Sequence, residues 1–283
     1  MNVGVIDVGS NSVRLLYNGQ KYVKNTQLSK NQLPGGPLKE SQISDTYEAV
    51  KKFVDFVREN DGEVRIFATE AVRSASNRDY FVSIIESLNV KLDVLSPERE
   101  ALIGFTGTYF GNGKTQAVLD VGGASSELIV GSDKGITYSH SLPLGSVRTR
   151  DLGLCPPELN EAVSQRVLEY GKVPAFSELV SIGGTTSTLV AIRNQMKDYD
   201  RDKVHLSVLT RDEILDVVEY INSVPMKLRR YITGLPFEKR DVIPAGGVLV
   251  AEIMKYLGVT ELTVSENDNL EGYLKLLTSG EIK

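Results

Sequence analysis

The sequence predicts an α/β protein made of two similar domains. An apolar strand that runs into Asp-x-Gly and then into small hydroxyl residues occurs twice, at 7–12 and at 120–127. Alternating strand-like and helix-like segments follow each copy, as is typical of α/β folds. A Gly-rich stretch at 111–114 separates the two halves. We therefore expect one domain over 1–115 and a second over 116–267.

The first domain is predicted to open with a β-hairpin, because two apolar strands flank a turn rich in Gly, Ser and Asn. Apolar residues then recur at helical spacing between 41 and 60, which predicts an amphipathic helix. Arg73 is expected at the end of an apolar strand segment. The predicted order is strands 2–7, 13–17 and 21–29, helix 41–60, strand 64–68, helix 77–88, strand 90–95 and helix 97–110.

The second domain repeats the hairpin-first order, which supports two similar folds. The predicted order is strands 116–121, 126–130 and 136–141, helices 146–152 and 158–170, strand 179–182, helices 186–196, 211–223 and 239–257, strand 262–265 and a closing helix from about 269.

Cysteine and histidine are scarce in this chain of 283 residues, which has one cysteine and two histidines, His140 and His205. A single cysteine excludes an intrachain disulfide and a thiolate zinc site, and two distant histidines exclude a multi-histidine metal centre. Any bound metal would therefore have oxygen ligands, which suits Mg²⁺.

Charge is distributed unevenly between the two halves. Residues 1–115 carry 14 basic and 14 acidic side chains, whereas residues 116–283 carry 18 and 23. Non-specific nucleic-acid binding needs a basic surface, so no nucleic-acid partner is expected. The sequence shows no secretory pattern and no apolar run long enough for a bilayer, so we expect a cytoplasmic protein without a membrane partner.

The two Asp-containing turns are the strongest candidates for a functional site. In each, a strand delivers an acidic side chain to a turn whose glycines allow a ligand to approach and whose N–H and hydroxyl groups suit an anion. Two such turns facing each other across a cleft would hold phosphates and a metal ion. The alternative is that Asp7 and Asp120 only shape their turns.

A further glycine-containing segment, Gly113-Lys114-Thr115, resembles the end of a nucleotide-binding P-loop. That motif needs a glycine at position 108, where this chain has Thr108. A strand is also predicted after the lysine, in place of the helix whose N-terminus would hold phosphate. We therefore expect no P-loop here.

Six segments, in the same order, resemble the exopolyphosphatase/guanosine pentaphosphate phosphohydrolase family of the actin–hexokinase–Hsp70 superfamily. The resemblance covers nearly the whole chain, and the start of the closing helix at 269–273 is similar as well. It implies two ribonuclease-H-like domains flanking a central cleft, with the closing helix, 268–283, joined to the first domain. The segments are Asp7-x-Gly-Ser-Asn-Ser-x-Arg-Leu15, Ala68-Thr-Glu-Ala-Val-Arg73, Ser96-Pro-Glu-Arg-Glu-Ala101, Asp120-Val-Gly-Gly-Ala-Ser-Ser-Glu-Leu128, Ser181-Ile-Gly-Gly-Thr-Thr-Ser-Thr-Leu189 and Arg240-Asp-Val-Ile-Pro-Ala-Gly-Gly247.

The reaction that this resemblance implies is hydrolysis of a terminal phosphoanhydride. Glu100 would be the general base that activates water, with Glu98 as the alternative because it lies in the same predicted helical turn. Arg73 would clamp a phosphate, and Asp120 and Glu127 would hold Mg²⁺ directly or through water. Glu127 would alternatively act in catalysis by orienting the attacking water. Arg14 would serve equally well as a structural residue, and Thr185 as a helix cap. The predicted phosphate-binding residues are Asp7, Gly9, Ser10, Asn11, Ser12, Arg14, Asp120, Gly122, Gly123, Ala124, Ser125, Ser126, Gly183, Gly184 and Thr185.

One position departs from the family pattern. The second turn usually has three glycines before its serine, and this chain has Ala124 in the third place. Alanine disfavours a positive φ, so the turn is either right-handed there or reshaped. The resemblance is otherwise to a short, two-domain form.

Two other functions stay open. A kinase or ATPase of the same superfamily would use Gly183-Gly184 and Gly246-Gly247 for a nucleotide, and a non-catalytic protein would bind an alarmone or polyphosphate and regulate a partner. The sequence does not choose between polyphosphate and guanosine pentaphosphate as substrate. A homodimer is an open alternative to a monomer.

Overall fold

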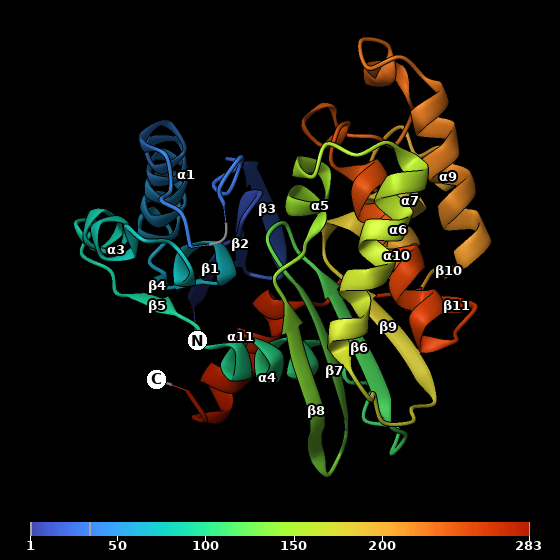
Figure 1. The fold of residues 1–283 in the computed structure, drawn as a ribbon. Helices are drawn as coiled ribbons and strands as arrows, with labels where there is room; N and C mark the ends of the chain where they lie inside the picture. The colour runs from blue at the N-terminus through green and yellow to red at the C-terminus, as the bar shows by residue number, and fades with distance from the viewer. Residues whose placement is uncertain (1, 34, 283) are drawn as a thin grey trace. The chain divides into compact units, whose positions relative to one another are not determined.

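The computed structural model describes residues 2–33 and 35–282 and divides into two compact units (Figure 1). Unit 1 comprises Met1–Gly107 and Asn269–Lys283, and unit 2 comprises Thr108–Asp268. The first boundary lies before the position expected from the Gly-rich stretch. Segment 108–115 goes with unit 2, where the Gln116 side-chain amide donates to the Thr108 carbonyl oxygen at 3.3 Å.

Unit 1 is built on a five-stranded sheet with the order β3-β2-β1-β4-β5. The β1–β2 and β2–β3 pairs are antiparallel, whereas β1–β4 and β4–β5 are parallel. The strands are β1 (Val3–Val8), β2 (Ser12–Tyr17), β3 (Gln20–Asn25), β4 (Glu63–Ala68) and β5 (Leu92–Val94). The helices are α1 (Glu40–Glu59), α2 (Glu70–Arg73), α3 (Arg78–Glu86), α4 (Pro97–Thr108) and α11 (Asn269–Ser279).

Strand β1 is buried on both of its faces, and its alternate residues therefore enter two different cores. Ile6 and Val8 belong to the core formed with α1 and α3. Val3 and Val5 belong to the core formed with α4 and α11, where Tyr273 stacks on a sheet phenylalanine with ring centroids 4.9 Å apart. This double burial fixes the end of β1, and with it the first Asp-containing turn.

Unit 2 is built on a six-stranded sheet with the order β10-β11-β9-β6-β7-β8. The strands are β6 (Gln116–Val121), β7 (Ser126–Ser132), β8 (Gly135–Leu142), β9 (Glu178–Ile182), β10 (Val208–Thr210) and β11 (Glu261–Val264). The helices are α5 (Ser146–Asp151), α6 (Pro156–Val167), α7 (Gly184–Arg193), α8 (Arg201–Val204), α9 (Arg211–Ser223) and α10 (Ile243–Leu257). Three short 3-10 turns are also present, at Leu168–Tyr170, Arg229–Tyr231 and Phe237–Lys239.

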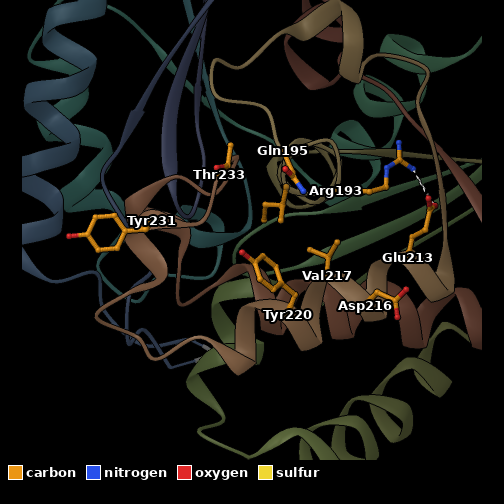
Figure 2. Close-up of a pocket in the computed structure, with 9 residues that line it drawn as sticks. Arg193, Gln195, Glu213, Asp216, Val217, Tyr220, Tyr231 and Thr233 are labelled. Carbon is orange, nitrogen blue, oxygen red and sulfur yellow. Dashed lines mark hydrogen bonds and ion pairs between the residues drawn. The ribbon is translucent and has the colours of Figure 1, made fainter.

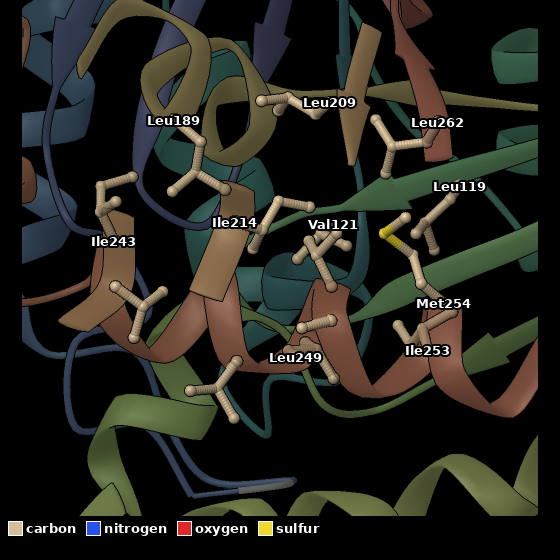
Figure 3. Packing of buried hydrophobic residues seen from close by; sticks show 14 of the residues in the cluster. Leu119, Val121, Leu189, Leu209, Ile214, Ile243, Leu249, Ile253, Met254 and Leu262 are labelled. Atoms are coloured by element: carbon tan, nitrogen blue, oxygen red, sulfur yellow. The ribbon is translucent and has the colours of Figure 1, made fainter. Parts of the chain in front are cut away.

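Helix α10 is the centre of the unit 2 core (Figure 3). Its residues Leu249, Ile253 and Met254 are fully buried in the same cluster as Leu119 of β6. A Cβ at Gly247 would lie 2.4 Å from a Val218 methyl carbon, so glycine lets α10 approach α9 closely. The core thereby holds β6, β9 and α7 in place, and these elements end at the candidate site.

The structure contains nearly all the elements that the sequence predicts, with ends that differ by a few residues. The three that were not predicted, α2, α8 and β10, span three or four residues, too few to show a hydrophobic period. The expectation for Arg73 was wrong: β4 ends at Ala68, and Arg73 lies in α2. Residues 111–114, which overlap the P-loop-like segment Gly113-Lys114-Thr115, are exposed, and this segment leads into strand β6 as predicted.

Across the described residues, no helix has both the length and the apolarity that crossing a membrane requires.

Candidate functional site

In unit 1 the first Asp-containing turn joins β1 to β2, and an arginine of the same hairpin pairs with its aspartate. Asp7 lies directly opposite Arg14 in the antiparallel register and is 3% exposed. Arg14 Nε donates to Asp7 Oδ2 at 3.0 Å, and its Nη2 donates to the same oxygen. Arg14 therefore stabilises the negative charge of Asp7 across the hairpin, which is the structural role left open by the sequence.

The main chain of the first turn is braced by the segment that follows β3. Gly9 N donates to the Ser12 carbonyl oxygen at 3.0 Å and closes the turn, and a Cβ at Gly9 would lie 3.1 Å from that oxygen. The N–H of Ser29 donates to the Ser10 carbonyl oxygen, and the N–H groups at 26 and 27 donate to that of Asn11. These carbonyl oxygens are thus engaged inside unit 1.

The predicted general base and the predicted clamp form a bonded pair, also in unit 1. Glu100, in the first turn of α4, is 5% exposed, and its Oε2 accepts from Arg73 Nη1 at 2.8 Å. Arg73 also donates to Glu70 Oε2 at 2.9 Å and to the Leu95 carbonyl oxygen at 2.7 Å. Glu98, by contrast, is exposed, and a hydrogen bond from Ser96 lowers its pKa. Burial and orientation therefore favour Glu100 over Glu98.

In unit 2 the second Asp-containing turn joins β6 to β7 and carries two like charges. Asp120 lies directly opposite Glu127 in the antiparallel register, as their spacing predicted. Glu127 is 3% exposed, and its Oε1 accepts from the Ser141 hydroxyl at 2.6 Å. Like charges directly opposite each other in a sheet are unfavourable, and two adjacent carboxylates offer oxygen donors of the kind that hold a cation.

The two carboxylates fit a magnesium ion by the chemistry of their donors. Mg²⁺ is commonly held by one or two carboxylates together with phosphate oxygens and water. Among the described residues no group of three or more Asp, Glu, His or Cys side chains gathers into a metal cluster. Asp120 and Glu127 therefore match a site that is completed by a phosphate ligand better than an all-protein cage.

The second turn is right-handed at its unusual alanine. Ala124 is fully buried and is not among the residues with positive φ. Of the two alternatives, a right-handed conformation at Ala124 or a reshaped turn, the structure has the right-handed conformation. Next to it, the Ser126 hydroxyl lies 2.7 Å from the Tyr170 hydroxyl, and both residues are buried. Ser126 thus anchors the start of β7 in the core.

The third predicted segment, between β9 and α7, lies against the second turn. Gly183 has a φ of 93°, and a Cβ there would lie 2.9 Å from Asp120 Oδ1. The Thr185 hydroxyl donates to the Val121 carbonyl oxygen at 3.4 Å, and no side chain caps α7. The helix-cap alternative for Thr185 is therefore wrong, because its hydroxyl bonds to β6. Lys239 Nζ donates to the Gly184 carbonyl oxygen at 3.1 Å.

Helix α5, which the sequence analysis did not connect with the site, begins at the second turn. Ser146 N donates to the Gly122 carbonyl oxygen at 2.8 Å, and Arg148 N donates to that of Gly123 at 3.2 Å. The Arg148 side chain is only 7% exposed.

The structure thus assembles the predicted residues as two groups, one in each unit. Unit 1 brings together Asp7 with Arg14, and Arg73 with Glu100. Unit 2 brings together Asp120, Glu127, the 122–126 turn and the 183–185 turn. The meeting of the two Asp-containing turns across a cleft stays a prediction.

A separate pocket of about 430 Å³ lies in unit 2 between the end of α7, α9 and segment 231–233 (Figure 2). Arg193 on its rim is paired with Glu213 at 3.2 Å, and Asp216 and Tyr220 lie along the same face of α9. None of the residues that the sequence predicts for the site is among those that line this pocket.

The chain is similar in sequence to several known proteins. The model of the Ppx/GppA phosphatase family matches residues 13–277. The chain is 32% identical to the bifunctional 3-dehydroquinate synthase/phosphatase of Fusobacterium nucleatum, over 94% of this chain and 45% of that protein. It is 28% identical to exopolyphosphatase 2 of Mycobacterium tuberculosis, over 95% and 96%. It is 24% identical to the guanosine-5'-triphosphate,3'-diphosphate pyrophosphatase of Aeromonas hydrophila, over 95% and 58%. The chain thus spans about half the length of two of these three relatives.

Solved structures give the same picture for the fold. The Ppx/GppA family member of Aquifex aeolicus is 25% identical, with a TM-score of 0.79 over 99% of this chain and 98% of that one. An exopolyphosphatase from Cytophaga hutchinsonii, at 22% identity, has a TM-score of 0.85 over 98% of both chains and is similar in fold. The prediction of an α/β fold with two sheets is confirmed.

Proposed function

Because this chain belongs to the Ppx/GppA phosphatase family, we propose that it is a hydrolase that removes the terminal phosphate of inorganic polyphosphate or guanosine pentaphosphate. Relatives named for each of these activities support both substrate classes. We further propose that the protein acts in the cytoplasm, where both substrates would be met.

The observation that carries the proposal is the buried carboxylate of Glu100 with its arginine partner. The Glu100 carboxylate is 5% exposed, and burying a charged group is unfavourable unless another group compensates the charge. Arg73 compensates the charge and leaves one orientation for the carboxylate. A fixed, ionised carboxylate is what a general base for water attack requires. By its contacts, Arg73 positions Glu100, and a direct role on phosphate stays part of the proposal.

In the proposed reaction, Glu100 accepts a proton from a water molecule whose oxygen attacks the terminal phosphorus in line. The bond between that phosphorus and its bridging oxygen breaks, which releases orthophosphate and the shortened chain or guanosine tetraphosphate. The second Asp-containing turn would hold the terminal phosphate, and the N–H groups of residues 122–125 would stabilise the developing charge.

Asp120 and Glu127 would hold Mg²⁺, which when bound neutralises charge on the phosphate oxygens. The like-charge register of these carboxylates in β6 and β7 supports this assignment. Gly183 beside Asp120 would let main-chain N–H groups reach the same phosphate, because no side chain intervenes.

The test is a pair of matched substitutions in the first turn of α4. Glu100→Gln keeps the size of the side chain and should lower turnover by about 100-fold or more, the usual scale for a general base. Glu98→Gln alters the exposed neighbour and should leave turnover unchanged. Release of orthophosphate from a panel of polyphosphate lengths and from guanosine pentaphosphate, with and without Mg²⁺, measures both. Near-normal turnover in Glu100→Gln would end the proposal.

The same assay separates the other two functions. A kinase or ATPase would transfer phosphate from ATP to an acceptor and ignore both proposed substrates. A non-catalytic regulator would bind polyphosphate or guanosine pentaphosphate and release no orthophosphate. Either result from the wild-type protein contradicts hydrolysis.

A further inference from the structure

A second pocket in unit 2 contains an exposed aromatic ring that the proposed reaction does not involve. The pocket has a volume of about 660 Å³ and is lined by residues 194–201 and 203, the segment that follows α7 and includes most of α8. Tyr199 lies on this segment and is 55% exposed. An exposed aromatic ring beside a pocket offers a face on which a planar ligand can stack.

The hydroxyl end of this ring is held in place by a carboxylate. Burial raises the pKa of the Tyr199 phenol, and so do the charge of Glu266 and the hydrogen bond that the phenol donates to it. The hydroxyl end is thus enclosed, and the exposed surface of the residue lies on the ring. A ring that is fixed at one end loses little conformational freedom when a ligand stacks on it, which favours binding.

Glu266 connects this ring to the predicted phosphate turn between β9 and α7. Ser187 Oγ donates to Glu266 Oε1, and the same oxygen lies 3.3 Å from the Gly183 carbonyl oxygen. Arg201 Nη2 donates to the Glu266 carbonyl oxygen at 3.2 Å, which ties the pocket segment to the same residue. Ser187 follows Gly183 by four residues, a rise of about 6 Å along a helix. The Tyr199 ring therefore lies about one helical turn from the Gly183 turn.

The lining of the pocket suits a guanine nucleotide better than a bare polyphosphate chain. Polyphosphate has no planar group that could stack on a ring, whereas guanosine pentaphosphate has a purine and a 3'-diphosphate. Lys197 provides an exposed ammonium group on the pocket segment, and Asp198 provides an exposed carboxylate. Guanine has two adjacent N–H donors, at N1 and at its amino group, and a carboxylate can accept from both. Adenine has no such pair.

We propose that Tyr199 is the stacking surface for the guanine ring of guanosine pentaphosphate, so that this pocket selects the nucleotide over polyphosphate. The inference rests on the proposed function for the position of the terminal phosphate. Stacking on an aromatic side chain needs a planar group, and only one of the two proposed substrates has one. Loss of the ring should therefore affect guanosine pentaphosphate and leave polyphosphate of every length unchanged.

The experiment compares Tyr199→Ala with Tyr220→Ala, the matched control, because Tyr220 is a tyrosine of the same unit that is 51% exposed. Isothermal titration, which needs no turnover, measures the affinity for guanosine tetraphosphate and for pyrophosphate. Tyr199→Ala should weaken guanosine tetraphosphate binding by about 5- to 100-fold, the range for stacking of one base, and leave pyrophosphate binding unchanged. In turnover, kcat/KM should fall by the same factor for guanosine pentaphosphate only. Tyr220→Ala should leave all of these values unchanged.

Three outcomes overturn the inference: unchanged guanosine tetraphosphate affinity in Tyr199→Ala, an equal loss of pyrophosphate affinity, or wild-type protein that binds ADP at least as tightly as GDP. If Tyr199→Ala does not fold, Tyr199→Leu decides, because leucine fills the space and has no aromatic face. Weaker guanosine tetraphosphate binding then supports the role, and wild-type affinity contradicts it. Failure of the proposed function is seen separately, as wild-type protein that releases no orthophosphate from either substrate, while the titration still decides whether Tyr199 binds guanine.

Discussion

The first hairpins of the two units have the same geometry and opposite electrostatics. In unit 1 the aspartate before the turn faces Arg14, and in unit 2 the corresponding aspartate faces Glu127. Both partners lie directly across an antiparallel pair, seven positions along the chain. The first hairpin therefore carries a balanced charge pair, whereas the second carries two negative charges.

This difference in charge indicates what each hairpin contributes to the proposed site. A balanced pair stabilises its own hairpin and holds Asp7 in one place without help from a ligand. A like-charge pair is less favourable in the free protein and becomes favourable once a cation lies between the carboxylates. We infer that metal chemistry belongs to unit 2 and that the first hairpin is a preformed support.

The largest expected effect comes from breaking the like-charge pair. Glu127→Gln keeps an acceptor for the Ser141 hydroxyl and removes one negative charge. Turnover should fall by about 100-fold or more, because metal-held charge neutralisation supplies several kcal/mol. The rise in melting temperature that Mg²⁺ gives the wild-type protein should disappear. Stability without Mg²⁺ should stay equal or rise by about 0.2–1 kcal/mol, the scale of a cross-strand pair.

Glu261→Gln is the control for that substitution, because Glu261 is an exposed strand residue in the same unit. It should leave both the Mg²⁺ response and turnover at wild-type values. If Mg²⁺ still raises the melting temperature of Glu127→Gln, then metal binding does not need this carboxylate. The assignment of the metal to the second hairpin would then be wrong.

The next effect comes from breaking the balanced pair in unit 1. Arg14→Gln removes the guanidinium that pairs with Asp7, which is 3% exposed. The free energy of unfolding should fall by about 1–3 kcal/mol, the penalty for removing a partner from a buried charged group. Urea unfolding followed by circular dichroism measures the loss. Mg²⁺ should still stabilise this variant, in contrast with Glu127→Gln.

Arg65→Gln is the matched control in the same sheet, since Arg65 pairs with Glu63 and both side chains are substantially exposed. An exposed pair of this kind contributes about 0–1 kcal/mol. If Arg14→Gln is no more destabilising than Arg65→Gln, then the first hairpin does not depend on its charge pair.

The hairpins also show how far the sequence alone leads. The strand–turn–strand pattern predicts that Glu127 lies across from Asp120, because seven residues on a tight hairpin return the chain to the same level. The partner of Glu100 is a different case. Arg73 is 27 positions away along the chain and lies in a one-turn helix that shows no hydrophobic period. Only the three-dimensional structure, in which the Arg73 guanidinium reaches Glu100 in the first turn of α4, reveals that pair.

Contacts that involve the main chain, or side chains far apart in the sequence, could not be predicted from the sequence either. Helix α5 was predicted, yet nothing in its sequence states that its first N–H groups bond to the carbonyl oxygens of the second turn. Ser126 was predicted as a phosphate ligand, but its hydroxyl lies beside Tyr170, a contact across 44 positions that no local pattern encodes.

The smallest expected effect concerns the turn of the second hairpin, where Ala124 replaces a family glycine. Its φ is not positive, and the glycines of both Asp-containing turns are likewise absent from the positive-φ residues. Alanine is therefore compatible with this backbone, and Ala124→Gly only adds freedom to the unfolded chain. The free energy of unfolding should fall by about 0.4–1 kcal/mol, with no change in kcat or KM. Urea unfolding and orthophosphate release measure the two quantities. A gain in turnover or stability would mean that the working turn visits a left-handed conformation at this position, and the two hairpins would then differ in backbone as well as in charge.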